Sequence, residues 1–439
     1  MKRDKISIGI IGFGTVGTGT AKILLESRDV IRGRTGFDIV LKRIADLDTT
    51  RDRGIKIPEG MLIADAGALL DDPEIDVVVE LMGGIRPAKD FMLRAIRNKK
   101  HVVTANKALL ATEGNDIFAE AEKNNVEVGF EASVAGGIPI IKVLREGLVA
   151  NNIVAIYGII NGTSNYILTK MTNEKVEFSD ALKEAQALGY AEADPTFDIE
   201  GIDTAHKLTI LSSLAYGIPL SYNEVYKEGI TRITAQDIEF ASEFGYKIKL
   251  LAVTKASNGE IEMRVHPTMV PNDYLISKID GVFNAVYVEG DAVGSTLYYG
   301  RGAGDMPTGS AVVSDIIDIG RNIMSGGVLR VSGITSSEMP RTGRKKIRKM
   351  EDIESMYYFR FAALDKPGIL SKISGVLGNN SISIVSVIQK GRRLGGSVPL
   401  VVLTHKAKER DVLNSIREID SMPVVSDKTL FIRVEGSEK

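Results

Sequence analysis

The chain has 439 residues, too many for one ordinary hydrophobic core, so two or three domains are expected. Its formal net charge of −2 gives no electrostatic basis for a nucleic-acid partner, and no apolar run approaches the roughly 20 residues that span a bilayer. The absence of cysteine excludes disulfides and thiolate chemistry, the four histidines are too scattered to predict a zinc cluster, and no signal-peptide layout precedes the first strand. We therefore expect a cytoplasmic protein with no nucleic-acid or membrane partner.

The N-terminal strand runs directly into a glycine-rich turn. Residues 5–11 are typical of a buried parallel strand, and a helical pattern follows over 18–26. Between them lie Gly12, Phe13, Gly14, Thr15, Val16 and Gly17. Strand, glycine turn and helix in this order make the dinucleotide-binding fingerprint, whose helix N-terminus receives the phosphates. The pattern predicts a Rossmann-type, doubly wound parallel sheet.

A second strand over 37–44 leads to Ala45 and Asp46. An acid at this place usually accepts hydrogen bonds from the ribose hydroxyls of NAD. Asp46 lies 34 residues after the first glycine of the turn, farther than the usual spacing of about 20. Arg43 and Arg51 are close enough in sequence to favour the 2′-phosphate of NADP instead. The choice between NAD and NADP stays open.

Two further strands bring polar residues to the ligand-binding edge of the sheet. Residues 75–81 and 101–104 read as strands separated by a helix over 87–98. The second of these strands ends at Thr104 and is followed closely by Lys107. Ligands bind at the carboxyl ends of the strands in a doubly wound sheet, so this lysine is placed to face the nicotinamide and the substrate. An ordinary surface lysine is the alternative.

Two loops come next. After a strand over 126–130, Glu131 heads a loop of small residues with several free carbonyl groups. Such a loop suits a hard monovalent cation, and a simple turn is the other interpretation. After a strand over 154–160, the run 161–166 (Asn-Gly-Thr-Ser-Asn-Tyr) predicts a turn, with Thr163 or Ser164 capping the next helix.

The stretch 185–207 concentrates charged residues. A turn-rich loop with several carboxylates gives way near Ile199 to a helical pattern, on which Asp203 and Lys207 are four residues apart and share a face. Taken alone, this is either a catalytic ammonium held by a carboxylate or an ordinary helix salt bridge. The residue order, however, resembles the signature of homoserine dehydrogenases, which this sequence matches at Ala185, Gly189, Tyr190, Ala191, Asp194, Pro195, Asp198, Ile199, Gly201, Asp203 and Lys207.

The resemblance implies an activity. A member of this family transfers a hydride reversibly between NAD or NADP and the pair L-homoserine and L-aspartate 4-semialdehyde, in threonine, methionine and isoleucine biosynthesis. A dehydrogenase acting on another small hydroxy acid or aldehyde, and a nucleotide-sensing regulator without turnover, are the alternatives. A panel of hydroxy amino acids would distinguish the first alternative, and NAD(P)H absorbance with homoserine the second.

The resemblance also implies roles for individual residues. Lys207 is the proton donor, Lys107 lies at the cofactor–substrate junction, and Asp203 orients Lys207. The substrate is bound by Glu192, Asp198, Asn161 and Thr163. A structural sodium ion is held by Glu131, Val134, Gly136 and Ile138. The cofactor contacts are Gly12, Phe13, Gly14, Thr15, Val16, Gly17, Ala45, Asp46, Thr104, Lys107 and Gly302.

The segment after the signature predicts a mixed sheet and a returning helix. Strands are expected near 250–253, 261–265 and 283–289, in a sheet that carries the dimer contact. The glycine-rich run 300–304 precedes a helix over 308–324 that would return to the first domain and place Gly302 near the cofactor. A flexible hinge is the alternative interpretation of this run.

The C-terminal region reads strand, helix, strand, strand, helix, strand over 357–434, after a polar, basic linker at 334–355. The turn 365–370 (Asp-Lys-Pro-Gly-Ile-Leu) opens the first helix of this pattern. The region resembles the regulatory ACT domain, a ferredoxin-like fold that binds amino acids at this turn, here at Gly368. A plain Pro-Gly turn is the alternative.

The predicted organisation follows. The fold class is α/β: a Rossmann-type domain at 1–132 with its returning helix at 308–330, an α+β substrate-binding and dimerisation domain at 133–307, and a ferredoxin-like ACT domain at 356–439. We expect a homodimer or homotetramer that is feedback-regulated by L-threonine.

Overall fold

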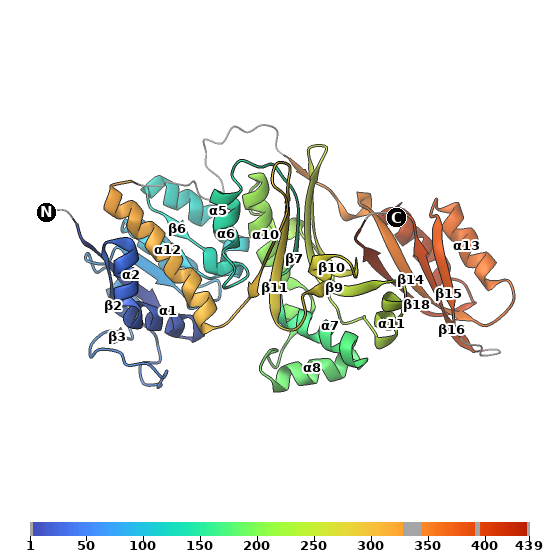
Figure 1. The fold of residues 1–439 in the computed structure, drawn as a ribbon, viewed down its shortest axis with the longest axis horizontal. Coiled ribbons are helices and arrows are strands. Elements are labelled where there is room, and N and C mark those ends of the chain that lie inside the picture. Colours follow the sequence, from blue (N-terminus) through green and yellow to red (C-terminus); the bar gives the residue numbers. More distant parts are fainter. Residues whose placement is uncertain (1–2, 328–344, 391–395, 437–439) are drawn as a thin grey trace. The chain divides into compact units, whose positions relative to one another are not determined.

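The computed structural model describes residues 3–327, 345–390 and 396–436 (Figure 1). The chain forms two compact units. The first unit comprises 1–160, 203–225 and 283–345, and the second comprises 161–202, 226–282 and 346–439. No helix among the described residues is long and apolar enough to cross a membrane.

A six-stranded parallel sheet is the framework of the first unit. Its strand order is β3-β2-β1-β4-β5-β6, and every pair in it is parallel. The strands are β1 (Lys5–Ile11), β2 (Asp38–Ala45), β3 (Leu62–Ile63), β4 (Val77–Glu80), β5 (His101–Thr104) and β6 (Val128–Gly129). This order confirms the predicted Rossmann-type sheet.

Helices cover both faces of this sheet. Neighbouring residues of one strand point to opposite faces, and in β1 the residues on each face contact a helix. Ile8 and Ile10 of β1 belong to a core cluster with Val312 and Ile316 of α12. Gly9, between them, faces Leu69 of α3, since a Cβ on Gly9 would lie 2.7 Å from that side chain. The helices are α1 (Thr15–Glu26), α2 (Arg28–Thr35), α3 (Ala66–Leu70), α4 (Ala88–Arg97), α5 (Lys107–Asn124) and α12 (Asp305–Ser325).

The helix α12 comes from far along the chain and lies alongside α1 (Figure 1). The two helices approach closely because glycines face each other: a Cβ on Gly309 would lie 2.8 Å from the backbone nitrogen of Thr20. The rest of the first unit consists of η1 (Glu131–Ser133), α6 (Ile140–Lys142), η2 (Val143–Gly147), β7 (Ile153–Ile159), α10 (Ile202–Tyr216), β11 (Phe283–Gly290) and β12 (Gly294–Arg301). Strand β11 pairs antiparallel with both β7 and β12.

The second unit is built around a long hairpin. Strands β9 (Tyr246–Ser257) and β10 (Glu260–Pro271) pair antiparallel along their whole length. Asn258 and Gly259 join them with φ angles of 52° and 78°, the left-handed conformation that a tight hairpin turn requires. The other elements are α7 (Gly162–Glu174), α8 (Phe178–Ala187), α9 (Thr196–Ile199), β8 (Tyr226–Lys227), α11 (Ala235–Glu243), η4 (Leu275–Lys278), β13 (Lys346–Ile347) and η5 (Met350–Asp352), whereas η3 (Tyr222–Glu224) belongs to the first unit.

The C-terminal module of this unit spans 354–434. Its order is β14 (Glu354–Leu364), α13 (Ile369–Asn379), β15 (Ile384–Gln389), β16 (Ser397–Thr404), α14 (Glu409–Asp420) and β18 (Val425–Val434), with a short β17 (Ala407–Lys408) beside β14. The sheet order β18-β14-β16-β15 is antiparallel throughout and confirms the predicted ferredoxin-like fold. Its own core forms around Tyr357, Phe359 and Phe361.

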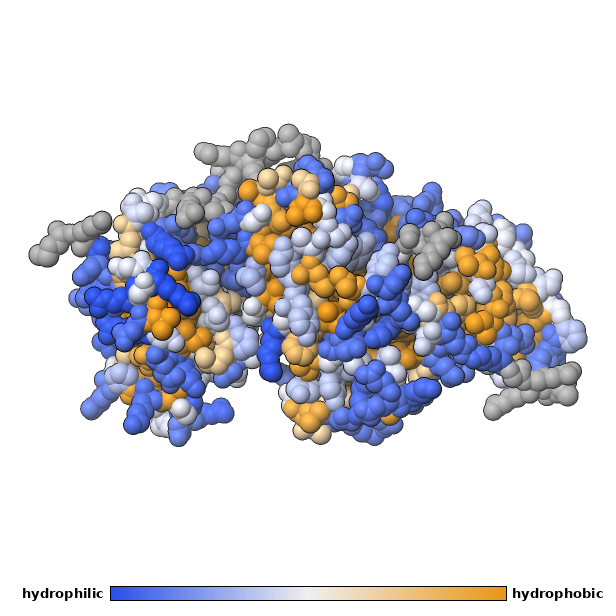
Figure 2. Space-filling model, viewed as in Figure 1, coloured by the Kyte–Doolittle hydropathy of each residue, from blue (hydrophilic) through white to orange (hydrophobic). Residues whose placement is uncertain are grey.

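The module is also continuous with the hairpin, because β18 pairs parallel with β10 at Thr268–Arg433 and Met269–Val434. Residues 334–344 of the predicted linker at 334–355 lie outside the described residues. The rest of the predicted linker contains the short strand β13. Exposed apolar residues of the module, Val385 and Val387, lie on β15 at the end of the sheet, where Figure 2 shows hydrophobic surface.

Candidate active site

The helix α10 holds a buried carboxylate between two lysines. Asp203 lies in its first turn, where the helix dipole favours a negative charge, and Lys207 follows one turn later. Lys207 Nζ lies 2.7 Å from Asp203 Oδ2 and donates to the carbonyl of Ile160, also at 2.7 Å. Lys107 Nζ lies 2.9 Å from the other oxygen, Oδ1. One carboxylate therefore fixes both ammonium groups.

The burial of these groups sets their electrostatics. The side chains of Asp203 and Lys207 are 6% and 10% exposed, whereas that of Lys107 is 39% exposed. Burial alone would raise the pKa of Asp203, but the charges of Lys207 and Lys107 outweigh it and hold that pKa well below its usual range. Asp203 is thus ionised at neutral pH, and the cluster carries a net positive charge where an oxyanion could form.

A hydrogen-bonded chain at the ends of β4 and β5 places Lys107. Glu80, fully buried, accepts from Thr104 Oγ1 at 2.7 Å and from the backbone nitrogen of Met82 at 2.9 Å. Thr104 Oγ1 accepts from the nitrogen of Asn106, whose own side chain caps α5 by accepting from Leu109 N at 3.1 Å. Sequence reasoning missed Glu80, although a carboxylate ending a buried strand was a usable signal.

The glycine turn has the geometry of a phosphate-binding loop. Gly12 adopts φ +98°, and a Cβ there would lie 2.6 Å from the backbone of Met82. A Cβ on Gly17 would overlap with the carbonyl oxygen of Gly12. Gly14 differs, because nothing lies within 4 Å of its missing Cβ, and it is the N-cap of α1 without a side-chain cap. The helix N-terminus is therefore open to an anion.

Asp46 is directed at this turn, and an arginine accompanies it. Asp46 Oδ2 accepts from the backbone nitrogen of Phe13 at 2.6 Å. Arg53 donates from Nε to the carbonyl of Phe13 at 2.6 Å, and its Nη2 lies 3.4 Å from Asp46 Oδ1. Of the arginines considered from the sequence, Arg43 instead donates to the carbonyl of Gly60. Arg53 was missed because it lies in a loop with no periodic signal.

The predicted sodium ligand Glu131 acts here as a helix cap. Its carboxylate oxygens accept from the backbone nitrogens of Ile141 and Lys142, each at 2.8 Å, at the start of α6. The predicted carbonyl ligand Ile138 accepts from Ile140 N at 2.8 Å. Burial raises the pKa of Glu131 to about 7. The backbone nitrogen of Glu131 donates to the partly buried carboxyl of Asp315. Among the described residues, no group of three or more His, Asp or Glu side chains could hold a metal.

In the second unit, α7 and α9 bring two predicted substrate residues together. Asn161 Nδ2 donates to Asp198 Oδ1 at 2.7 Å. Asn161 is also the N-cap of α7, accepting from Ser164 N at 2.8 Å, so the cap expected from Thr163 or Ser164 was wrong. The hydroxyl of Thr163 instead donates to the carbonyl of Tyr190.

The remaining predicted residues lie on loops or at helix starts. Glu192 is exposed on the loop before α9. Gly302 has a packing reason to be glycine, because a Cβ would overlap with the Asn284 side chain. Gly368 is the N-cap of α13 at φ +85°, with nothing within 4 Å of its missing Cβ. Of the predicted cation loop, Val134 and Gly136 are buried.

Family models match the chain in three parts. The model for the homoserine dehydrogenase NAD binding domain matches residues 12–131, that for homoserine dehydrogenase matches 139–317, and that for the ACT domain matches 357–421. The homoserine dehydrogenase of Neisseria gonorrhoeae is 48% identical over 431 residues, which cover 98% of this chain and 99% of that protein.

Solved structures agree with these matches. The structure of a homoserine dehydrogenase from Thiobacillus denitrificans is similar with a TM-score of 0.93 and 47% identity, covering 99% of each chain. A hyperthermophilic archaeal homoserine dehydrogenase mutant in complex with NADPH is similar with a TM-score of 0.60 and 29% identity, covering 72% of this chain and 98% of that one.

Proposed function

This chain belongs to the homoserine dehydrogenase family, and from that premise we propose how its residues carry out the reaction. As an NAD(P)-dependent oxidoreductase, it interconverts L-homoserine and L-aspartate 4-semialdehyde. The nicotinamide of the bound cofactor supplies or accepts the hydride. The protein must then move one proton at the substrate oxygen and stabilise the charge that develops there.

Lys207 is the proton donor in the direction of aldehyde reduction. An alkoxide forms as the carbonyl carbon gains a hydride, and the ammonium of Lys207 protonates it; in homoserine oxidation the same group receives the proton. Lys107 stabilises the developing negative charge. The observation that supports both roles is that Asp203 holds one lysine on each of its oxygens, at 2.7 and 2.9 Å.

Residues of the second unit bind the amino-acid end of the substrate. Asn161 donates to Asp198 at 2.7 Å and so fixes the carboxylate of Asp198 in the position proposed to contact the substrate. Glu192 binds the substrate ammonium, as its exposed carboxylate permits. Thr163 holds the loop at Tyr190 through its hydroxyl and completes this group.

The cofactor lies on the glycine turn and is preferentially NADP. Asp46 would disfavour a 2′-phosphate if it stood alone, but Arg53 compensates its charge and stacks over the ring of Phe13 at 4.7 Å. The similar archaeal enzyme was solved with NADPH. Ala45, Thr104 and Gly302 are further proposed cofactor contacts.

An amino-acid effector binds at the start of α13. Gly368 opens that helix N-terminus, which suits a carboxylate, and we assign L-threonine as the effector. The exposed apolar residues Val385 and Val387 on the outermost strand of the module support homo-oligomerisation through this edge. A cytoplasmic location stays a prediction that cell fractionation would check.

A monovalent cation at the loop of Glu131 is a separate proposal. The buried carboxylate has lone pairs beyond the two amides that it caps, and the carbonyl groups of 134, 136 and 138 are its neighbours in the chain. No step of hydride or proton transfer passes through this ion. Thermal unfolding in sodium and in choline chloride at equal ionic strength tests it, with stabilisation by sodium expected.

The experiment that tests the catalytic assignment compares homoserine oxidation by the wild type and the Lys207→Ala variant. We expect the variant to bind NADP⁺ normally and to lose turnover. Near-normal turnover would remove the role assigned to Lys207.

A further inference from the structure

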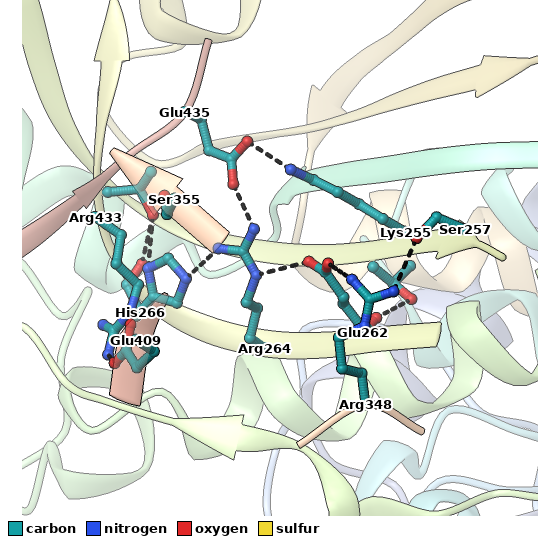
Figure 3. Close-up of polar contacts among 12 residues, drawn as sticks. Lys255, Ser257, Glu262, Arg264, His266, Arg348, Ser355, Glu409, Arg433 and Glu435 are labelled. Carbon is teal, nitrogen blue, oxygen red and sulfur yellow. Dashed lines mark hydrogen bonds and ion pairs between the residues drawn. The ribbon is translucent and has the colours of Figure 1, made fainter. Parts of the chain in front are cut away.

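Buried charges join the C-terminal module to the hairpin of the same unit (Figure 3). Arg264 on β10 donates to Glu435 at 2.6 Å, and Arg433 on β18 donates from Nε to Glu409 at 3.0 Å. Both arginines are only 1% exposed. Replacing a buried ion pair by apolar residues is often neutral or stabilising, so this arrangement calls for a role other than stability.

Arg433 also contacts residues outside the module. Arg433 Nη1 donates to Glu228 Oε2 at 2.7 Å, and Nη2 donates to the hydroxyl of Tyr226 at 3.1 Å. That hydroxyl donates in turn to Glu228 Oε2 at 3.0 Å. The guanidinium also lies over the ring of Tyr226, 5.0 Å from its centroid. The carboxylate of Glu228 is therefore held by two donors.

The three residues that follow this carboxylate lie against the end of α9. Gly229 has no space for a side chain, since a Cβ would lie 2.5 Å from both Glu200 Oε2 and the carbonyl oxygen of Ile199. The backbone nitrogen of Ile230 donates to the carbonyl of Ile199 at 2.8 Å, and Thr231 Oγ1 donates to Glu200 Oε1 at 3.2 Å. A shift of this segment would therefore move α9.

Asp198 directly precedes Ile199 and Glu200, the two residues that contact segment 228–231. Its carboxylate accepts from Asn161 at 2.7 Å, and its carbonyl accepts from the hydroxyl of Ser164 at 2.9 Å. Both partners belong to the start of α7. Asp198 is thus held from one side by α7, and the turn that carries it is held from the other side by segment 228–231.

We propose that Arg433 and Glu228 are positioning residues for the reaction, through which the C-terminal module holds α9, and with it Asp198, in the arrangement that binds homoserine. The proposal rests on the substrate role proposed above for Asp198. It predicts that breaking this pair weakens substrate binding and leaves cofactor binding unchanged, which a role in stability alone would not do.

The chain offers a matched control in Lys255. This lysine on β9 pairs with Glu435 at 2.8 Å, so it also joins the hairpin to the C-terminal end of the module. Its partner is Glu435, whereas Arg433 donates to Glu228 of segment 228–231. Lys255→Met therefore removes an ion pair between the same two parts without touching α9.

The test measures kcat, the KM for homoserine, the KM for NADP⁺ and Tm in the full-length protein. We expect Glu228→Ala to raise the KM for homoserine about tenfold and to leave the KM for NADP⁺ within about twofold. Glu228→Gln keeps an oxygen acceptor for Arg433 and should recover most of the loss. Lys255→Met should leave both KM values within about twofold, even if its Tm falls as far as that of Glu228→Ala.

Two further variants separate this proposal from the substrate role on which it rests. Gly229→Ala should reproduce the rise in the KM for homoserine, because the added Cβ pushes on α9. If Asp198→Ala leaves that KM unchanged, the substrate role and the positioning proposal both fail. If Asp198→Ala raises it and Glu228→Ala does not, or if Glu228→Ala and Lys255→Met change it equally, only the positioning proposal is overturned.

Discussion

At the scale of single residues, the proposed proton transfer depends on Asp203, because two lysines share its carboxylate. Its two oxygens hold Lys207 and Lys107 at 2.7 and 2.9 Å, and the same charges keep it ionised. Removing the charge of Asp203 leaves two ammonium groups side by side without their anion. Both lysines then lose their orientation relative to the reacting carbon.

Asp203→Asn should therefore lower kcat by about 100-fold, since a small displacement of catalytic groups is that costly. The measurement is steady-state homoserine oxidation with saturating NADP⁺. Asp318→Asn is the matched control, because Asp318 pairs with Lys142 as the carboxylate of another lysine ion pair in the same unit. Equal activity of the two variants would contradict the role of Asp203.

Arg53 is the residue that decides cofactor preference in this account. Arg53→Ala should raise the KM for NADP⁺ about tenfold and change that for NAD⁺ little, because it removes the charge that offsets Asp46. Calorimetric binding of 2′,5′-ADP against 5′-AMP gives a readout independent of turnover. Arg43→Ala is the control, since the guanidinium of Arg43 donates to the carbonyl of Gly60. An equal loss of affinity for NADP⁺ and NAD⁺ would contradict the role assigned to Arg53.

At the scale of elements, the burial of Glu131 at the start of α6 links stability to pH. Burial raises the pKa of Glu131 from 4.5 to about 7, so the folded state favours the protonated form. The stabilisation is complete below the unfolded pKa and is lost as the pH rises through 7. Between pH 5 and pH 8 this cost amounts to about 2.5 kcal/mol in the free energy of unfolding.

Urea unfolding of the wild type and Glu131→Gln over this pH range, in sodium-free buffer so that the proposed cation does not hold the carboxylate ionised, measures the effect. The glutamine variant should show a flatter dependence on pH, because its side chain does not titrate, although its single oxygen can replace only one of the two acceptors of Glu131. If both proteins lose the same free energy between pH 5 and pH 8, the titration of Glu131 is not its source.

The elements themselves could be predicted wherever hydrophobic periodicity was strong. The parallel strands β1, β2 and β5 are apolar runs that end in turn residues, and the sequence placed them within one or two residues. The helix α10 was harder, because nearly every residue from 203 to 213 is buried and no polar face marks its direction. The strand β12 was missed, since its apolar and aromatic residues form one short run, 297–299, between polar residues and glycines and show no alternation.

The site could be predicted in part for the same reason. Asp203 and Lys207 were found because both lie on one helix, four residues apart. Their third partner, Lys107, comes from another helix, and a single sequence does not show which oxygen it contacts. Glu80 and Arg53 act through folded contacts with residues 24 and 40 positions away, which no local pattern records.

At the scale of the whole molecule, the C-terminal module matches the ACT domain and shares a sheet with the hairpin of its unit. The sequence predicted the module as a separate ferredoxin-like fold, and the parallel pairing of β18 with β10 could not be foreseen. Strand pairing between distant segments depends on edges that only the folded chain presents. A signal at the start of α13 therefore has a continuous sheet through which to act.

Gly368→Ala should abolish inhibition by L-threonine and leave kcat unchanged. The glycine adopts φ +85°, which alanine rarely does, so the helix N-terminus would distort. Gly375→Ala is the control, because Gly375 lies on the same helix with open space around its missing Cβ. The measurement is the inhibition constant for L-threonine in the wild type, Gly368→Ala and Gly375→Ala. Undiminished inhibition of Gly368→Ala would place the effector elsewhere.

The most direct measurement of the central assignment is a single-turnover assay of Lys207→Ala beside Lys207→Arg and the wild type, with NADP⁺ affinity measured on the same samples. The account predicts that both variants bind NADP⁺ as the wild type does, and that alanine slows hydride transfer about 1000-fold. Arginine, which does not release its proton near neutral pH, should not restore the rate. Hydride transfer at the wild-type rate in Lys207→Ala would show that another group moves the proton.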